Sequence, residues 1–108
     1  METVYQKLHK VISECKAMYP KTSKEYNAMI IFVDTALESY KKWASGTTDV
    51  ANDFARDYLH NLSLAIDMLW TLNIIPTEKR HAIADVCEEE SQRLLNKRLG
   101  FKVPEEIF

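Results

Sequence analysis

Glycine and proline are scarce in this chain. Only two Gly and three Pro occur among its 108 residues, so folds built from strands and tight turns are poorly supplied with turn residues. The length fits one domain. Apolar residues make up 46% of the chain and charged residues 28%, which is ordinary for a globular protein. The composition therefore favours a single, mainly helical domain.

The sequence also lacks a strong charge of either sign and a long apolar run. Its formal net charge is −2, which provides no positive field for a nucleic-acid backbone. The most hydrophobic stretch, residues 62–75, is interrupted by Asp67 and is shorter than the roughly 20 residues of a spanning helix. The first ten residues contain no apolar segment typical of a signal peptide. We therefore expect a cytoplasmic protein that binds neither nucleic acid nor membrane.

Cysteine is rare and has no motif spacing. Cys15 and Cys87 both fall among apolar helix positions, which predicts buried free thiols in a reducing compartment rather than a disulfide. Cys87 would be a nucleophile only if a base approached it, and a small buried thiol is the commoner case.

Patterns typical of metal sites are equally poor. Glu78 and His81 form one Glu-x-x-His pair, but the second copy that a di-metal bundle site uses is missing. The three histidines, His9, His60 and His81, fall at different heights along the predicted helices, which argues against a shared zinc ion. We expect no metal, no cofactor and no catalytic residue.

Four amphipathic segments are present instead. Apolar residues recur at helical spacing over about residues 3–18, 23–44, 48–73 and 77–99, followed by a tail over 100–108. The residues expected to end these helices are the capping-box pairs Thr3–Gln6 and Thr22–Glu25, Gly46 in a left-handed C-cap, Thr47, Thr48 and Asp49 as sources of N-cap oxygens for the third helix, Thr77 as the N-cap of the fourth, Pro76 as a stop, and Gly100 after the last helix.

The connections between these segments are roughly three to five residues long, which makes successive helices antiparallel neighbours. The sequence therefore predicts one all-α domain over residues 1–108. Its expected architecture is an up-down-up-down antiparallel four-helix bundle with a short C-terminal tail.

One polar line runs along the predicted helix 48–73. At 100° per residue, its members fall within a narrow arc of the helix. We interpret the line as the solvent face of the helix, and the alternative is a charged groove for a ligand. The residues of the line are Asp49, Asp53, Arg56, His60, Ser63, Asp67 and Thr71.

The apolar arc of the same helix is wider than two neighbours in a simple bundle would cover. Either the tail folds back over it or a second copy of the chain buries it across a two-fold axis, and we favour the second copy because the first helix is short. Ile31 lies out of phase with the apolar face of its own helix, which weakly supports an interface. The candidate interface residues are Ile31, Leu59, Ile66, Trp70, Phe101, Ile107 and Phe108.

Glu90 breaks the pattern of the predicted fourth helix, because it falls inside the apolar arc. Counting back from the corner near Ile75 places it level with His60 on the neighbouring helix. The favoured interpretation is that Glu90 bends its carboxylate to water at the edge of the arc. The alternative is a Glu90–His60 pair that forms a pH-sensitive or ligand-binding site. The candidate polar site comprises Arg56, His60, Asp67, Glu90 and Arg93.

No residue pattern assigns the chain to a family. We expect a non-catalytic helical interaction protein, of the inhibitor or adaptor type encoded by phages and other mobile elements, that acts through protein–protein contacts as a homodimer. The alternative is a protein that binds or sequesters a small nucleotide-like ligand through Arg56, His60 or Arg93. A helical nucleotide hydrolase is least favoured, because the paired Glu-x-x-Glu motifs that hold Mg²⁺ in such enzymes are missing.

Overall fold

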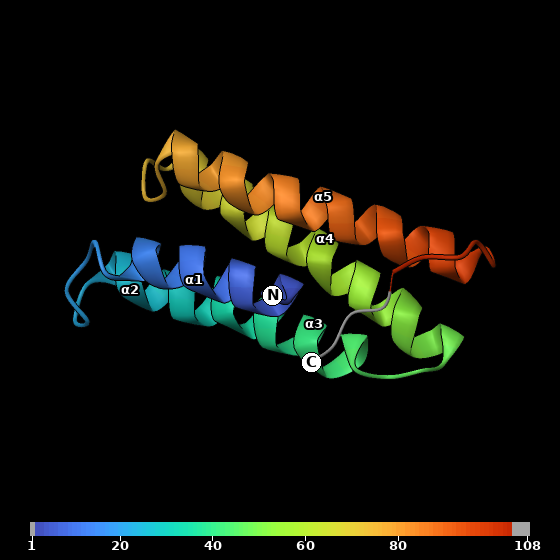
Figure 1. Cartoon of the computed structure of the whole chain (residues 1–108). Helices are drawn as coiled ribbons and strands as arrows, with labels where there is room; N and C mark the ends of the chain where they lie inside the picture. The colour runs from blue at the N-terminus through green and yellow to red at the C-terminus, as the bar shows by residue number, and fades with distance from the viewer. Residues whose placement is uncertain (1, 105–108) are drawn as a thin grey trace.

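The computed structural model describes residues 2–104, and within this range all regular secondary structure is helical. α1 (Val4–Lys16) and α4 (Asp49–Thr71) each pack against α3 (Thr35–Ala44) and α5 (Thr77–Arg98), so they lie diagonally across a bundle 44 Å long. The α1–α2 and α4–α5 connections lie at one end of the bundle and the α3–α4 connection lies at the other (Figure 1). The prediction of an all-α four-helix bundle is confirmed.

Three of the predicted helix ends are confirmed by their hydrogen bonds or dihedral angles. The Thr3 hydroxyl accepts a hydrogen bond from the Gln6 backbone N–H, and the Gln6 side chain accepts one from the Thr3 backbone N–H, which completes a capping box. Thr48 caps α4 by accepting from the N–H of Ala51 at 3.1 Å. Gly100 has a φ of 89° just after α5, as expected of a left-handed C-cap.

Other predicted ends are wrong in detail. The cap of the second helix is Ser23 rather than Thr22, because the Ser23 hydroxyl accepts from the Tyr26 N–H. Thr77 does not cap α5: its hydroxyl accepts a hydrogen bond from the Trp70 indole at 3.0 Å, and Pro76 occupies the N-cap position. The α4–α5 corner is therefore held by a side-chain contact between the two helices.

Gly46 does not adopt the predicted left-handed conformation. Positive φ angles in the described residues occur at Asn73, with 62°, and at Gly100. The reason for glycine at position 46 is space, because a Cβ there would lie 2.7 Å from the Cβ of Ala51. The α3–α4 corner is thus too tight for a side chain.

The second helical segment is interrupted by a π-helical stretch. α2 (Lys24–Ala28) continues into η1 (Met29–Asp34) and then into α3. The wider turn of a π-helix shifts the phase of the side chains that follow it. As a result three successive apolar residues face outward, and their exposed fractions are 38% for Ile30, 52% for Ile31 and 50% for Phe32.

The core lies along the bundle axis and receives side chains from each helix of the bundle. α4 contributes Leu59, Leu62, Ile66 and Leu69, each at most 2% exposed. The candidate interface residues Leu59 and Ile66 are therefore core residues, which corrects the prediction. Although α4 is largely apolar, no helix within residues 2–104 has both the length and the apolar character needed to cross a bilayer.

Candidate functional site

The polar line of α4 faces α5 rather than only water. Arginines of α5 pair with both ends of this line. At one end, Arg98 Nη1 lies 3.5 Å from Asp49 Oδ2 and Arg98 Nε lies 3.2 Å from Asp53 Oδ1. At the other end, Arg80 Nε donates to Asp67 Oδ1 at 2.8 Å. The interpretation as a purely solvent-facing line is wrong for Asp67, which is half-buried in the contact between the two helices.

The register of this contact differs from the predicted one by three residues. Asp67 pairs with Arg80, and the Asn52 side chain donates to the Leu94 carbonyl at 2.9 Å. Extended along both helices, this register places His60 level with Cys87 rather than with Glu90. The same register places Arg56 level with Ser91.

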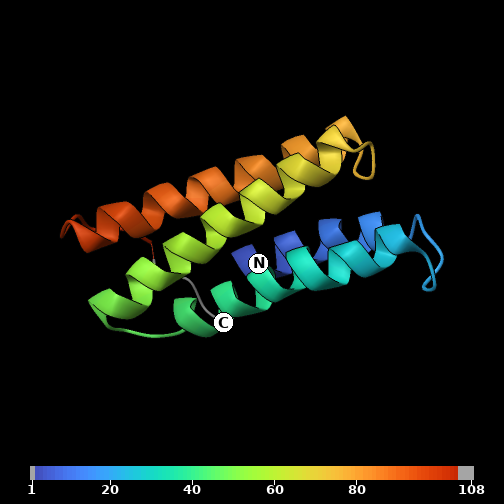
Figure 2. The same cartoon turned by 180° about the vertical axis from the view of Figure 1, so that it is seen from behind.

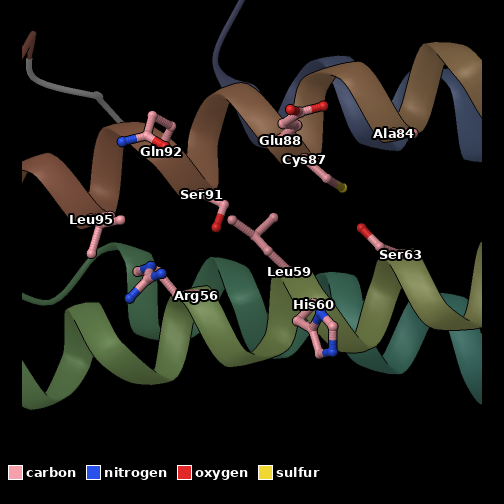
Figure 3. Close-up of a pocket in the computed structure, with 10 residues that line it drawn as sticks. All are labelled: Arg56, Leu59, His60, Ser63, Ala84, Cys87, Glu88, Ser91, Gln92 and Leu95. Atoms are coloured by element: carbon pink, nitrogen blue, oxygen red, sulfur yellow. The ribbon is translucent and has the colours of Figure 1, made fainter.

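A cavity of about 360 Å³ opens between the two helices at this height. Figure 3 shows that Ser91 and Leu95 extend from α5 toward α4, whereas Glu88 and Gln92 lie on the far side of α5 in this view. The His60 ring lies at the outer edge of α4. The lining residues are Arg56, Leu59, His60, Ser63, Ala84, Cys87, Glu88, Ser91, Gln92 and Leu95.

Arg56 is the cation of this cavity. Its Nε atom is buried and has no hydrogen-bond partner in the described part of the chain. Buried donors without a partner are rare and costly, typically by 1–3 kcal/mol. The sequence had indicated Arg56 and His60 as candidates for a polar site, and both line this cavity. It had missed Ser91, which a correct α4–α5 register would have indicated.

Cys87 lies in the wall of the cavity and is nearly fully buried. Burial raises the pKa of its thiol to about 11, against a smaller lowering effect of the hydrogen bond with Ser63. Figure 3 shows the Ser63 hydroxyl and the Cys87 thiol turned toward one another. The thiol is therefore protonated near neutral pH and is not the activated form that a nucleophilic cysteine needs. The prediction of two buried free thiols, Cys15 and Cys87, is confirmed.

Glu90 forms a separate buried network. The Tyr40 hydroxyl donates to its carboxylate at 2.5 Å, and Arg93 donates to both carboxylate oxygens, at 2.5 and 3.0 Å. Glu90 is 2% exposed, so the interpretation in which it bends toward water is wrong, and its partners are Tyr40 and Arg93 rather than His60. Arg93 also donates to the Pro104 carbonyl at 2.9 Å, which ties residue 104 to α5.

The candidate polar residues thus belong to three groups. Arg56 and His60 line the cavity, Asp67 pairs with Arg80, and Glu90 with Arg93 forms the buried network. Among residues 2–104, no three His, Cys, Asp or Glu side chains gather in a way that would hold a metal ion.

A second feature is an apolar stripe on the outer face of α4. Four of its apolar residues and its C-cap residue, Leu72, are exposed, although a bundle helix normally turns polar residues to water. We call these residues the α4 stripe, and Figure 2 views the bundle from the side of α3 and α4. Their exposed fractions are 60% for Val50, 42% for Phe54, 54% for Leu64, 47% for Met68 and 62% for Leu72.

The exposed apolar residues of the stripe differ from the predicted interface residues. Ile31 and Phe101 are exposed as expected, at 52% and 64%. Trp70 is partly buried beneath the Arg80 guanidinium, which lies 4.4 Å from its ring centre. The remaining two candidates, Ile107 and Phe108, lie outside the described residues. The sequence predicted the wide apolar arc of α4 correctly, but it did not predict which apolar residues of the arc are exposed.

Comparison of the chain with protein-family models, with curated proteins and with solved structures gives no match.

Proposed function

We propose that this protein is a non-catalytic interaction protein that self-associates through the α4 stripe. The observation that carries the proposal is the arrangement of the stripe about Asn61. Val50 and Leu72 lie eleven residues to either side of Asn61, and Phe54 and Met68 lie seven residues to either side. The stripe is therefore nearly the same when it is read in either direction along the helix.

This symmetry is what a two-fold interface requires. In such an interface the same patch meets itself, so each residue of one copy faces its counterpart in the other. An antiparallel pair of α4 helices with Asn61 on the axis sets Phe54 against Met68 of the second copy. It also sets Val50 against Leu72. These two pairs each join apolar side chains, whereas the counterpart of Leu64 is Tyr58 and the exposed Asp57 lies opposite Ala65.

Asn61 gives this pairing its register. The side chain is exposed and lies at the centre of an otherwise mostly apolar stripe. A polar residue at the centre of apolar contacts favours the alignment in which it meets its own counterpart, because other registers bury the amide against hydrocarbon. The Asn61 amide, with both donor and acceptor groups, can pair with the same amide across a two-fold axis.

η1 extends the interacting surface beyond one helix. Stable interfaces bury about 800 Å² on each partner, which is more than a single helix stripe supplies. η1 packs beside α4 and exposes Ile31 and Phe32. We therefore expect the second copy to contact η1 as well as α4.

Sedimentation equilibrium tests the proposal, because it measures the mass of the particle in solution. We expect twice the chain mass of 12.6 kDa for the wild-type protein. Met68→Glu places a carboxylate against Phe54 of the second copy, and we expect it to raise the dimer dissociation constant about 100-fold.

Leu99→Glu is the matched control, because Leu99 is as exposed as the stripe residues, at 63%, but lies at the end of α5. We expect it to leave the dimer intact. A monomeric wild-type protein at micromolar concentration would contradict the proposal. Equal weakening by Met68→Glu and Leu99→Glu would show that the stripe is not the interface.

A further inference from the structure

We propose that the cavity between α4 and α5 binds a small oxyanion, a carboxylate or phosphate group, on the guanidinium of Arg56. The cavity holds about 360 Å³, which lies at the lower end of the range for small-ligand sites. The inference does not depend on self-association, because none of the residues that line the cavity between α4 and α5 belongs to the α4 stripe.

The partners of the other arginines set Arg56 apart. The chain has four arginines, and Arg80, Arg93 and Arg98 each pair with at least one carboxylate. Arg56 has no ion pair among the described residues, and its buried Nε has no acceptor. An oxyanion in the cavity would supply both the missing negative charge and an oxygen acceptor.

The geometry of a guanidinium suits this class of ligand. Arginine presents parallel N–H groups that match the two oxygens of a carboxylate or phosphate. Ser91 extends from α5 toward α4 and carries its hydroxyl into the space beside Arg56 (Figure 3). Leu59 and Leu95 form apolar walls, which lower the local dielectric constant and strengthen a charged hydrogen bond.

The carboxylate nearest the cavity does not fill this role. Glu88 lines the cavity but forms no ion pair with Arg56, and Figure 3 shows its side chain directed away from α4. His60 lies at the rim as a second nitrogen donor. Arg93, the other candidate ligand contact from the sequence, is engaged by Glu90, so the site rests on Arg56.

The test measures the thermal unfolding midpoint in sodium phosphate, in sodium succinate and in sodium chloride at equal ionic strength. A ligand that binds only the folded state raises the midpoint. We expect one of the two anions, at about 10 mM, to raise the midpoint by roughly 5 °C or more above the chloride value. A response to phosphate alone assigns a tetrahedral anion, and a response to succinate alone assigns a carboxylate.

Two variants probe the site and one serves as control. Arg56→Met keeps much of the side-chain volume and removes the charge, so we expect it to abolish the anion-specific shift. We also expect it to raise the midpoint without ligand, because it removes an unsatisfied buried donor; this verifies that the variant folds. Ser91→Ala should weaken binding several-fold. Arg98→Met removes one positive charge at the end of the α4–α5 contact and should leave the anion-specific shift of the midpoint unchanged.

Two results would overturn the proposal. One is a midpoint that responds to neither phosphate nor succinate beyond the effect of chloride. The other is a shift of equal size in the wild-type protein and in Arg56→Met, since phosphate stabilises many folded proteins by being excluded from their surface.

Discussion

The side of α4 that faces α5 is polar and partly buried, whereas the side that faces water carries the exposed α4 stripe. On the first side Asp67, Arg56 and Asn52 lie in or beside the helix–helix contact. On the second side, Leu64 and Met68 are about half-exposed. A helix that served only this bundle would place these two kinds of residue the other way round.

This difference between the two sides of α4 has an energetic explanation. Polar groups lose their water partners in a helix–helix contact and are costly there unless they are paired. α5 supplies most of those partners, so the contact is specific in register. Apolar residues on the outer face gain nothing in an isolated bundle, but covering each would contribute on the order of 1 kcal/mol. The outer face is therefore suited to a contact outside the bundle.

The largest expected effect is at the buried carboxylate on the α5 side. Replacing Glu90 by Leu removes the buried carboxylate that accepts hydrogen bonds from Tyr40 and Arg93. We expect a loss of about 3 kcal/mol in the free energy of unfolding, measured by urea denaturation at fixed protein concentration. Glu89→Leu, at an exposed neighbouring position, should change stability little. A stabilised Glu90→Leu variant would show that the buried network is dispensable.

The second prediction concerns the pH dependence of stability that arises from the Cys87 thiol between α4 and α5. Burial raises the pKa of Cys87 from 9.0 to about 11, so the unfolded chain loses the thiol proton before the folded chain does. The contribution to stability is therefore complete below about pH 9 and lost as the pH rises to about 11, a fall of about 2 kcal/mol. Urea denaturation across this range should show a smaller fall in Cys87→Ala than in wild type, because burial also raises the pKa of Cys15. Identical alkaline slopes would contradict the assignment.

A smaller effect is expected where the polar contact is half-exposed. Arg80→Ala removes the pair with Asp67 and the contact with the Trp70 ring, and we expect a loss of about 1 kcal/mol. Arg98→Ala is the comparison, since its pairs are more exposed, and its loss should stay below about 0.5 kcal/mol. Equal losses of stability in Arg80→Ala and Arg98→Ala would show that burial does not determine the strength of the ion pairs between α4 and α5.

Sequence alone could predict the helices because helix ends and apolar spacing are local properties. Thr3, Thr48 and Gly100 mark ends that need only a few neighbouring residues. Glu90 was recognisable as an outlier inside an apolar arc, but its partner Tyr40 is 50 residues away. No local pattern indicates that pairing.

For a related reason, the sequence did not indicate which neighbour the polar line of α4 faces. A helical wheel gives angles between side chains, but not which angle points to which neighbour. Arg56 and Asp67 share a line with exposed residues such as Asp49, and only the register with α5 separates them. The π-helical segment η1 changed the phase of Ile31 and Phe32, and no residue type in the sequence announced it.

Disulfide trapping at the proposed two-fold axis tests the central claim most directly. The native thiols, Cys15 and Cys87, are buried and do not compete under mild oxidation. In an antiparallel pair with Asn61 on the axis, Asn61→Cys brings two thiols within reach of each other, since a disulfide requires Cα atoms about 4.4–6.8 Å apart. Val50→Cys is the control, because its counterpart in the second copy would lie six helical turns away, about 33 Å.

We expect a covalent dimer of Asn61→Cys on a non-reducing gel, lost on reduction, and a monomer for Val50→Cys. No covalent dimer of Asn61→Cys, or equal amounts from both variants, would contradict an antiparallel interface centred on Asn61.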